Sequence, residues 1–131
     1  MRIVIIYTYY KHLYIMFNGG EAAMLIQTRT IVVEAGHADQ AVERFSKPGL
    51  VDGREGLIDI SVMVNKRKKD EEEVVVMIRW ESEEAWKNWE KSPEHIQGHR
   101  DRRGQEPPAF VKSTTVNMYE VKAVRQGTHK E

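Results

Sequence analysis

Hydrophobic and polar positions alternate along several stretches of the chain in the way that half-buried β-strands require. The clearest stretch is residues 25–34, LIQTRTIVVE. Five of its side chains share one face of the predicted strand: Leu25, Gln27, Arg29, Ile31 and Val33. Further strands are predicted at 57–65, 74–80 and 111–124. The charged run 66–73 between the middle two is typical of a solvated hairpin connection, so these two strands are expected to pair antiparallel.

Helical spacing replaces this alternation in three places. Residues 37–45, HADQAVERF, place small and apolar side chains on one face, which predicts an amphipathic helix. Ser82 is placed to cap a second helix, because acidic residues follow it in what would be the first turn. Ser92 and Pro93 predict the start of a third, which Gly98 and the basic run at 100–103 are expected to end. Loops are expected at residues 46–56 and 102–110, because both segments are rich in Gly and Pro.

The order of these elements is strand, helix, strand, strand, helix pair, strand. This order predicts an α+β ferredoxin-like sandwich, with helices on one face of a four-stranded antiparallel sheet. The other face of such a sheet needs cover. We expect a second copy of the chain to provide it, which gives a homodimer with a dimeric α/β barrel.

Composition narrows the classes of function. A chain of 131 residues is one domain by size. Its 20 basic and 20 acidic residues cancel, so no overall field attracts nucleic acid or a membrane surface. The absence of cysteine excludes disulfides and thiolate chemistry, and it fits a cytoplasmic location.

The first 23 residues differ from the rest because they are apolar, aromatic and interrupted by charge. They are too short for a continuous membrane-spanning helix and fit a signal peptide poorly. The segment Gly19-Gly20-Glu21 could be encoded by a purine-rich ribosome-binding sequence, and Met24 follows it closely. We therefore expect Met24 to be the true start and residues 1–23 to be a translated leader, with a disordered arm or a peripheral strand as the alternatives. The functional domain is then 24–125, followed by a flexible tail at 126–131.

Tryptophans and histidines gather in the predicted helix pair. Trp86 and Trp89 lie three positions apart and form a stripe that usually faces a core, whereas the neighbouring charged residues, Glu90 among them, are expected to point elsewhere. His95 and His99 lie four apart and share a helix face. Such a pair alone does not make a zinc site, because a third ligand is needed.

The spacing of these residues carries a resemblance. The motif W-x8-W-x-K-S-x-E-H-x-x-x-H resembles the corresponding region of the IsdG-type haem-degrading monooxygenases, and most of all the short Bacillus-type members, whose domain is related to that of the antibiotic-biosynthesis monooxygenases. In this chain its positions are Trp80, Trp89, Lys91, Ser92, Glu94, His95 and His99. The similarity extends from Met24 to about Val124.

The resemblance implies a homodimer in which each protomer takes one haem between sheet and helices. His99 would be the axial iron ligand, and Trp89 would press the porphyrin out of plane. The sheet faces of 57–80 could supply apolar walls, and Arg100 with its basic neighbours could meet the propionates. Haem would be both cofactor and substrate, with O2 and an external electron donor, for instance a separate reductase.

One position departs from the family. Its asparagine on the first strand, which hydrogen-bonds the oxygen ligand, aligns with Arg29, and Gln27 lies on the same face. Arginine donates hydrogen bonds but accepts none, so Arg29 could contact the oxygen ligand, bind a propionate or be structural. Two alternative functions therefore stay open. One is a haem-binding or haem-buffering protein without turnover, and the other is a cofactor-free monooxygenase of the antibiotic-biosynthesis type.

Overall fold

A four-stranded antiparallel sheet forms the centre of the molecule. The structure is a computed structural model that describes residues 3–9, 12–17, 23–65 and 69–129. The strand order is β4-β5-β3-β6. The strands span Leu57–Val64 (β4), Glu71–Trp80 (β5), Leu25–Glu34 (β3) and Val111–Glu120 (β6). The ferredoxin-like α+β class predicted from the sequence is confirmed.

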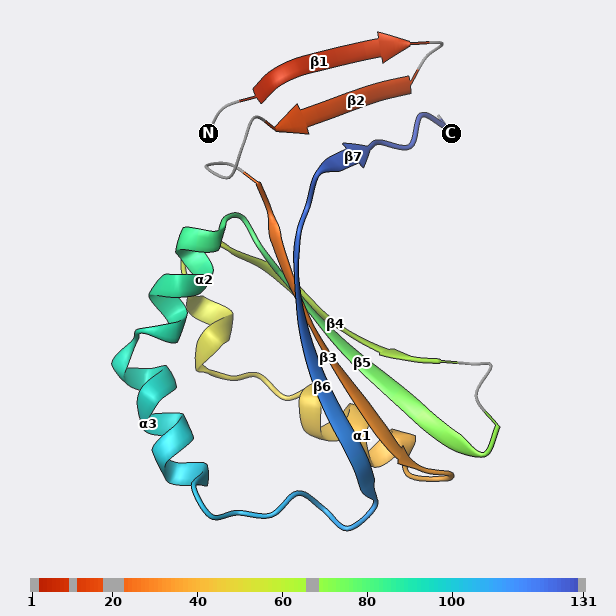
Figure 1. Cartoon of the computed structure of the whole chain (residues 1–131), viewed down its shortest axis with the longest axis vertical. Coiled ribbons are helices and arrows are strands. Elements are labelled where there is room, and N and C mark those ends of the chain that lie inside the picture. Colours follow the sequence, from red (N-terminus) through yellow and green to blue (C-terminus); the bar gives the residue numbers. More distant parts are fainter. Residues whose placement is uncertain (1–2, 10–11, 18–22, 66–68, 130–131) are drawn as a thin grey trace.

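The helices cover one face of this sheet (Figure 1). They are α1 (Ala38–Phe45), α2 (Glu83–Glu90) and α3 (Pro93–Arg102), and a short 3-10 helix, Leu50–Gly53, interrupts the predicted loop at 46–56. Two buried alanines of α1 pack on the sheet. They meet a cluster from the two central strands, whose buried members are Ile31, Val33, Val74 and Val76. The core therefore lies under α1, where small helix side chains allow close approach to the β-branched strand residues.

The two helix starts predicted at serines are confirmed. The Ser82 hydroxyl accepts a hydrogen bond from Ala85 N at 3.1 Å, and the Ser92 hydroxyl accepts one from His95 N at 3.2 Å. The predicted end of the third helix is confirmed at the basic run, because α3 ends at Arg102, whereas Gly98 lies inside the helix and does not end it. The left-handed turn that follows is made by Gly104, with φ of 83°.

The acidic run at 71–73 is not part of the hairpin connection that the sequence suggested. It forms the start of β5, where Glu71 pairs with Glu34 of β3, whereas residues 66–68 lie outside the described residues. The Glu72 carboxylate accepts hydrogen bonds from Gly36 N at 2.6 Å and Ala38 N at 3.2 Å. It thus caps the start of α1, a role that the His37 side chain does not fill.

The last strand predicted at 111–124 is divided in the structure. β6 ends at Glu120, and residues Ala123–Arg125 form β7, which pairs with β2 (His12–Phe17) of an antiparallel hairpin. The other strand of that hairpin is β1, Ile3–Tyr9 (Figure 1). This small sheet is the peripheral strand arrangement named among the alternatives for the first 23 residues. The start at Met24 stays a prediction.

Candidate functional site

Trp89 and His99, the two residues that the sequence analysis singled out, come together through a third residue. Trp89 lies near the end of α2, and the short junction at Lys91 and Ser92 turns the chain into α3. The ring of His95 meets the Trp89 ring edge-on, with centroids 4.9 Å apart, and it meets the His99 ring at 4.5 Å. The predicted shared face of the two histidines is confirmed, and the indole belongs to the same cluster.

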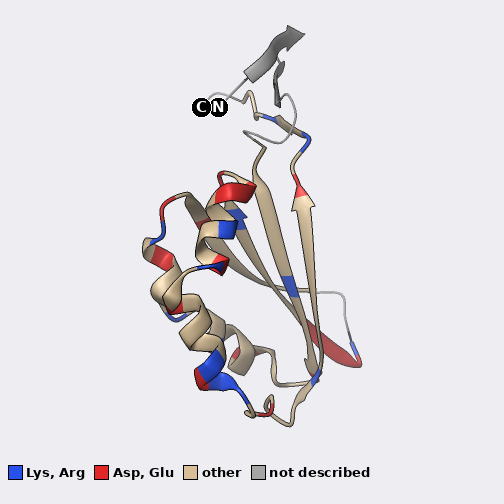
Figure 2. Ribbon diagram, turned by 60° about the vertical axis from the view of Figure 1, so that its left-hand side comes forward, with Lys and Arg blue, Asp and Glu red and all other residues tan. Residues whose placement is uncertain are grey.

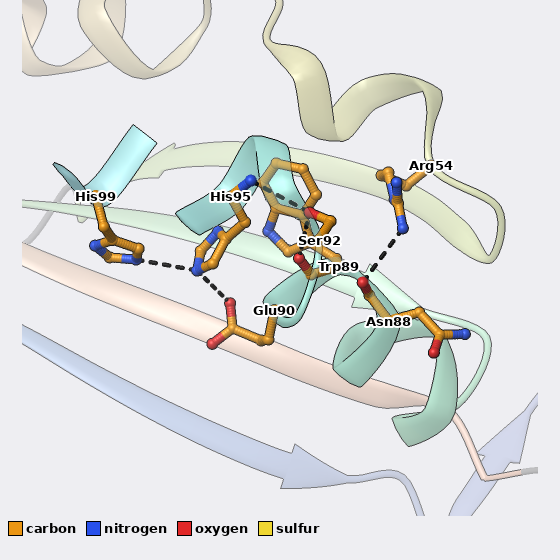
Figure 3. A network of polar contacts seen from close by, with 7 residues as sticks. All are labelled: Arg54, Asn88, Trp89, Glu90, Ser92, His95 and His99. Carbon is orange, nitrogen blue, oxygen red and sulfur yellow. Dashed lines mark hydrogen bonds and ion pairs between the residues drawn. The ribbon is translucent and has the colours of Figure 1, made fainter. Parts of the chain in front are cut away.

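His95 is the centre of a polar network (Figure 3). Its Nε2 lies 2.7 Å from Glu90 Oε2 and 3.0 Å from His99 Nε2. Its backbone N–H donates to the Ser92 hydroxyl, which in turn donates to the Trp89 carbonyl oxygen at 2.7 Å. The expectation that Glu90 points elsewhere is wrong, because the turn between α2 and α3 brings the last residue of α2 back toward His95.

The partners of this network determine where its protons lie. An ionised carboxylate only accepts hydrogen bonds, so the Nε2 of His95 bears the hydrogen that is donated to Glu90. Burial lowers the pKa of His95, an effect that the charge of Glu90 opposes and that His99 and Arg102 reinforce. His95 is therefore neutral at neutral pH, and His99 presents Nε2 as an acceptor toward it.

The third helix stands on the protein surface without a core of its own. None of its side chains is buried, His99 is exposed, and Ile96 is 41% exposed. On α2, Trp86 and Trp89 are half-buried, and the indole N–H of Trp86 is buried without an acceptor. The interpretation of these tryptophans as a core-facing stripe is therefore only half correct, because Trp89 lies against His95 and within 5.8 Å of the Arg54 guanidinium.

The face of the sheet that carries the helices has polar and apolar side chains on β3 and β6. Gln27 pairs across the ladder with Met118, and Arg29 pairs with Val116, so these four side chains share the face that carries the helices. Val116 is 46% exposed and Met118 is 38% exposed. The β3–β6 half of this face therefore presents apolar surface that no helix buries, with an amide and a guanidinium beside it.

The expectation that 57–80 supplies the apolar walls of a ligand site stays a prediction, but burial excludes most of the helix side of β5 from it. The helix-side residues Val74, Val76 and Trp80 of β5 are 0%, 5% and 1% exposed, because α1 and α2 cover them. They belong to the core and offer little surface to a ligand. Exposed apolar side chains of this face lie on β6, at Val116 and Met118, and at Val64 near the end of β4.

Positive charge gathers at the end of α3 (Figure 2). Arg100 follows His99 directly and is exposed, and Arg102 lies in the same last turn. Cations here are favourable because the last turn of a helix carries partial negative charge. Arg100 is also adjacent to His99 in the chain, where its guanidinium could bind an acidic group of a ligand held by His99.

A cavity of 130 Å³ lies between α1, the sheet and the loop before β6. Arg29 and Arg44 line it together with Phe45, Pro108 and Phe110. The structure thus places Arg29 and Arg44 on the wall of one cavity, and it places Arg29 on the same face of β3 as Gln27 and Ile31, as the alternation predicted.

Metal binding by protein side chains alone finds no support in the described part of the chain. No group of three His, Asp or Glu side chains there is arranged to hold a metal ion. His95 and His99 lie side by side, but Glu90 is paired with His95 and does not complete a set of three ligands.

The sheet and the helices on one of its faces define a ferredoxin-like α+β protein. Comparison with known proteins identifies the family. Residues 24–101 match the antibiotic biosynthesis monooxygenase family, and because this is more than half of the chain, the chain belongs to that family. The resemblance inferred from the sequence is confirmed.

Relatives of known name cover nearly the whole of this domain. The haem-degrading monooxygenase HmoA of Bacillus subtilis is 49% identical over 108 residues, which is 82% of this chain and 100% of the relative. A haem-degrading monooxygenase of Halalkalibacterium halodurans is 35% identical over 102 residues, 78% of this chain and 85% of the relative. Among solved structures, an antibiotic biosynthesis monooxygenase from Bacillus cereus has a TM-score of 0.66 and 46% identity, and covers 76% of this chain and 94% of its own.

Within the described residues, the helices of the structure are all too short or too polar to cross a membrane.

Proposed function

We propose that the chain is a haem-degrading monooxygenase that holds haem between α3 and the β3–β6 half of the sheet. The observation that carries the proposal is the exposed His99, whose acceptor Nε2 meets the His95 ring that packs on Trp89. Its helix leaves apolar side chains of the sheet uncovered. The names of the relatives at 49% and 35% identity support the same function.

The residues present fit a haem. A porphyrin needs an apolar surface, and Val116 and Met118 offer one. Its iron needs a neutral imidazole nitrogen with a free lone pair, which His99 Nε2 provides once its contact with His95 is broken. The propionates need cations, and Arg100 is exposed next to the proposed ligand.

When bound, haem supplies the iron that activates O2 and the ring that is oxidised, with electrons from an external donor such as a separate reductase. The protein supplies orientation. His99 fixes the iron relative to α3, and Trp89, braced by the edge of His95 and the guanidinium of Arg54, presents a rigid wall to the porphyrin. A wall that distorts the ring changes its reactive geometry more than its affinity, so Trp89 is proposed to govern rate.

Arg29 and Gln27 are proposed to act from the sheet side. Both lie on the helix-facing side of β3, opposite the helix that carries His99. Arg29 stands where the family's asparagine is expected and donates hydrogen bonds only. It is proposed to orient the oxygen side of the haem, while Gln27 offers both a donor and an acceptor beside it.

The opposite face of the sheet is proposed to form a homodimer. Tyr119 is 52% exposed and Met63 is 40% exposed, and both lie on the face without helices. Ile26, Val32 and Met77 on the same face are half-buried. A second copy would cover this surface, and sedimentation should then find a dimer that Tyr119→Glu converts to a monomer. The absence of cysteine supports a cytoplasmic location for the enzyme.

Turnover tests the proposed activity. Purified protein loaded with hemin is given a reductant and O2, and the Soret band is followed together with iron captured by a ferrous chelator. We expect the band to decay while iron is released, and we expect Trp89→Ala to slow the decay with little loss of hemin affinity. Trp89→Phe, which keeps an aromatic wall, is the matched control.

Two other outcomes would replace the proposal. Saturable hemin binding without decay or a bilin product would identify a haem-buffering protein. Absence of hemin binding together with oxidation of a quinol would identify a cofactor-free monooxygenase.

A further inference from the structure

The side chain nearest to the proposed iron ligand is another histidine. His95 Nε2 lies 3.0 Å from His99 Nε2, and the two rings meet nearly at right angles, at 80° (Figure 3). The contact joins the same nitrogen of His99 that is proposed to bind iron. An imidazole nitrogen has one lone pair in the ring plane, so it cannot accept this hydrogen bond and coordinate a metal at the same time.

The direction of the hydrogen bond follows from Glu90. Its carboxylate lies 2.7 Å from His95 Nε2 and can only accept, so the hydrogen is on His95. The same N–H is shared with His99 Nε2, which is therefore the acceptor. Glu90 thus makes His95 the hydrogen-bond donor to His99.

His95 is held in this position by more than one contact. The side chain is 18% exposed, its ring packs edge-on against Trp89, and its backbone N–H bonds the Ser92 hydroxyl. A donor fixed in this way keeps its hydrogen bond until something displaces it, because reorienting the ring would expose the N–H or break its bond to Glu90.

We propose that His95, fixed by Glu90, is a latch that occupies the iron-binding nitrogen of His99 in the haem-free protein and is displaced when haem binds. The inference rests on the proposed function, since it takes His99 as the ligand. His95 acts through His99 and is a positioning residue. Its hydrogen bond orients the His99 ring but opposes coordination of iron. The wild-type protein should therefore bind haem more weakly than a variant that lacks this hydrogen bond.

The latch makes an unusual prediction, because removal of a histidine should tighten haem binding. His95→Phe keeps an aromatic ring against Trp89 and removes the N–H. We expect its hemin dissociation constant to fall by about two- to tenfold, the range of one net hydrogen bond. His95→Ala should also lower the hemin dissociation constant. This second variant keeps the test valid if His95→Phe folds poorly. Gln97→Ala, an exposed change on the same helix at a side chain that bonds Asp101, should leave the dissociation constant unchanged.

A second readout needs no haem. The ¹⁵N resonance of His99 Nε2 in the haem-free protein should move in His95→Phe, because the nitrogen loses its hydrogen-bond donor. Glu90→Gln should give a smaller change in both readouts, since an amide oxygen still accepts from His95.

The outcomes separate the inference from the proposed function. Unchanged or weaker hemin binding in His95→Phe, or an unmoved His99 resonance, overturns the latch while wild-type binding and its loss in His99→Ala still support the function. Absence of saturable hemin binding in the wild-type protein overturns both.

Discussion

The junction between α2 and α3 depends on one buried hydroxyl, and its removal should cost more than an ordinary helix cap. Ser92 is 5% exposed, accepts from His95 N and donates to the Trp89 carbonyl oxygen. Loss of the cap costs about 1 kcal/mol. Loss of the donated bond costs about 1 kcal/mol more, since the Trp89 carbonyl oxygen loses the hydroxyl donor of Ser92. Ser92→Ala should therefore lower the free energy of unfolding by about 2 kcal/mol.

The assay is urea unfolding followed by circular dichroism, together with a thermal melt. For a chain of this size the expected loss lowers the midpoint temperature by about 6–10 °C. Ser82→Ala is the matched control, because Ser82 makes a single capping bond to Ala85 N and its loss should cost about 1 kcal/mol. The reasoning is refuted if Ser92→Ala costs no more than Ser82→Ala. Ser92→Thr, which keeps the hydroxyl, should recover most of the stability.

Three further predictions concern the turn before β4, the open face of the sheet and the sheet side of the site. Gly56→Ala should lower the free energy of unfolding by more than about 2 kcal/mol. The backbone φ of Gly56 is +87°, and the new Cβ would lie 2.4 Å from the Cβ of Ala85. An unchanged urea midpoint would contradict this prediction. The hydrogen bond from Arg79 lowers the pKa of Asp59 below 3.8, so the stability that this pair contributes is present above about pH 4 and is lost as the pH falls through the folded pKa. In urea titrations the advantage of wild type over Asp59→Asn should therefore shrink as the pH falls below about 4. An advantage that grows would show the sign to be wrong. Arg29→Asn should change the rate of Soret decay or the product spectrum and alter hemin affinity by less than about threefold, whereas a larger loss of affinity would assign Arg29 to a propionate.

The sequence was most informative where the cause of a structure is local. Ser82 and Ser92 were found as helix caps because each hydroxyl bonds a backbone N–H three residues along the chain. The alternation in β3 predicted that Gln27 and Arg29 share a face, and the register of the ladder confirms it.

Contacts between distant segments produced the errors. Glu72 was assigned to a solvated connection because nothing nearby shows that it caps the start of α1, 34 and 36 positions away. The division of the last strand depends on its pairing with β2, more than 100 residues earlier in the chain.

Glu90 was missed as a site residue for a related reason. Helical spacing along α2 alone points it away from the tryptophans, and only the turn into α3 brings its carboxylate to His95. The presence of an acid five positions before a histidine, across a Ser-Pro helix start, is the signal that could have found it.

The most direct test of the account is a hemin titration of the wild-type protein and His99→Ala, followed by absorbance. With His99 as the iron ligand, we expect a Soret band that saturates at about one haem per chain in the wild-type protein and is lost or strongly weakened in the variant. His37→Ala, which removes the histidine that stacks on Phe110 and makes no contact in the Trp89–His95–His99 network, should titrate like wild type. Equal, saturable hemin binding by wild type and His99→Ala would contradict the assignment of the iron ligand.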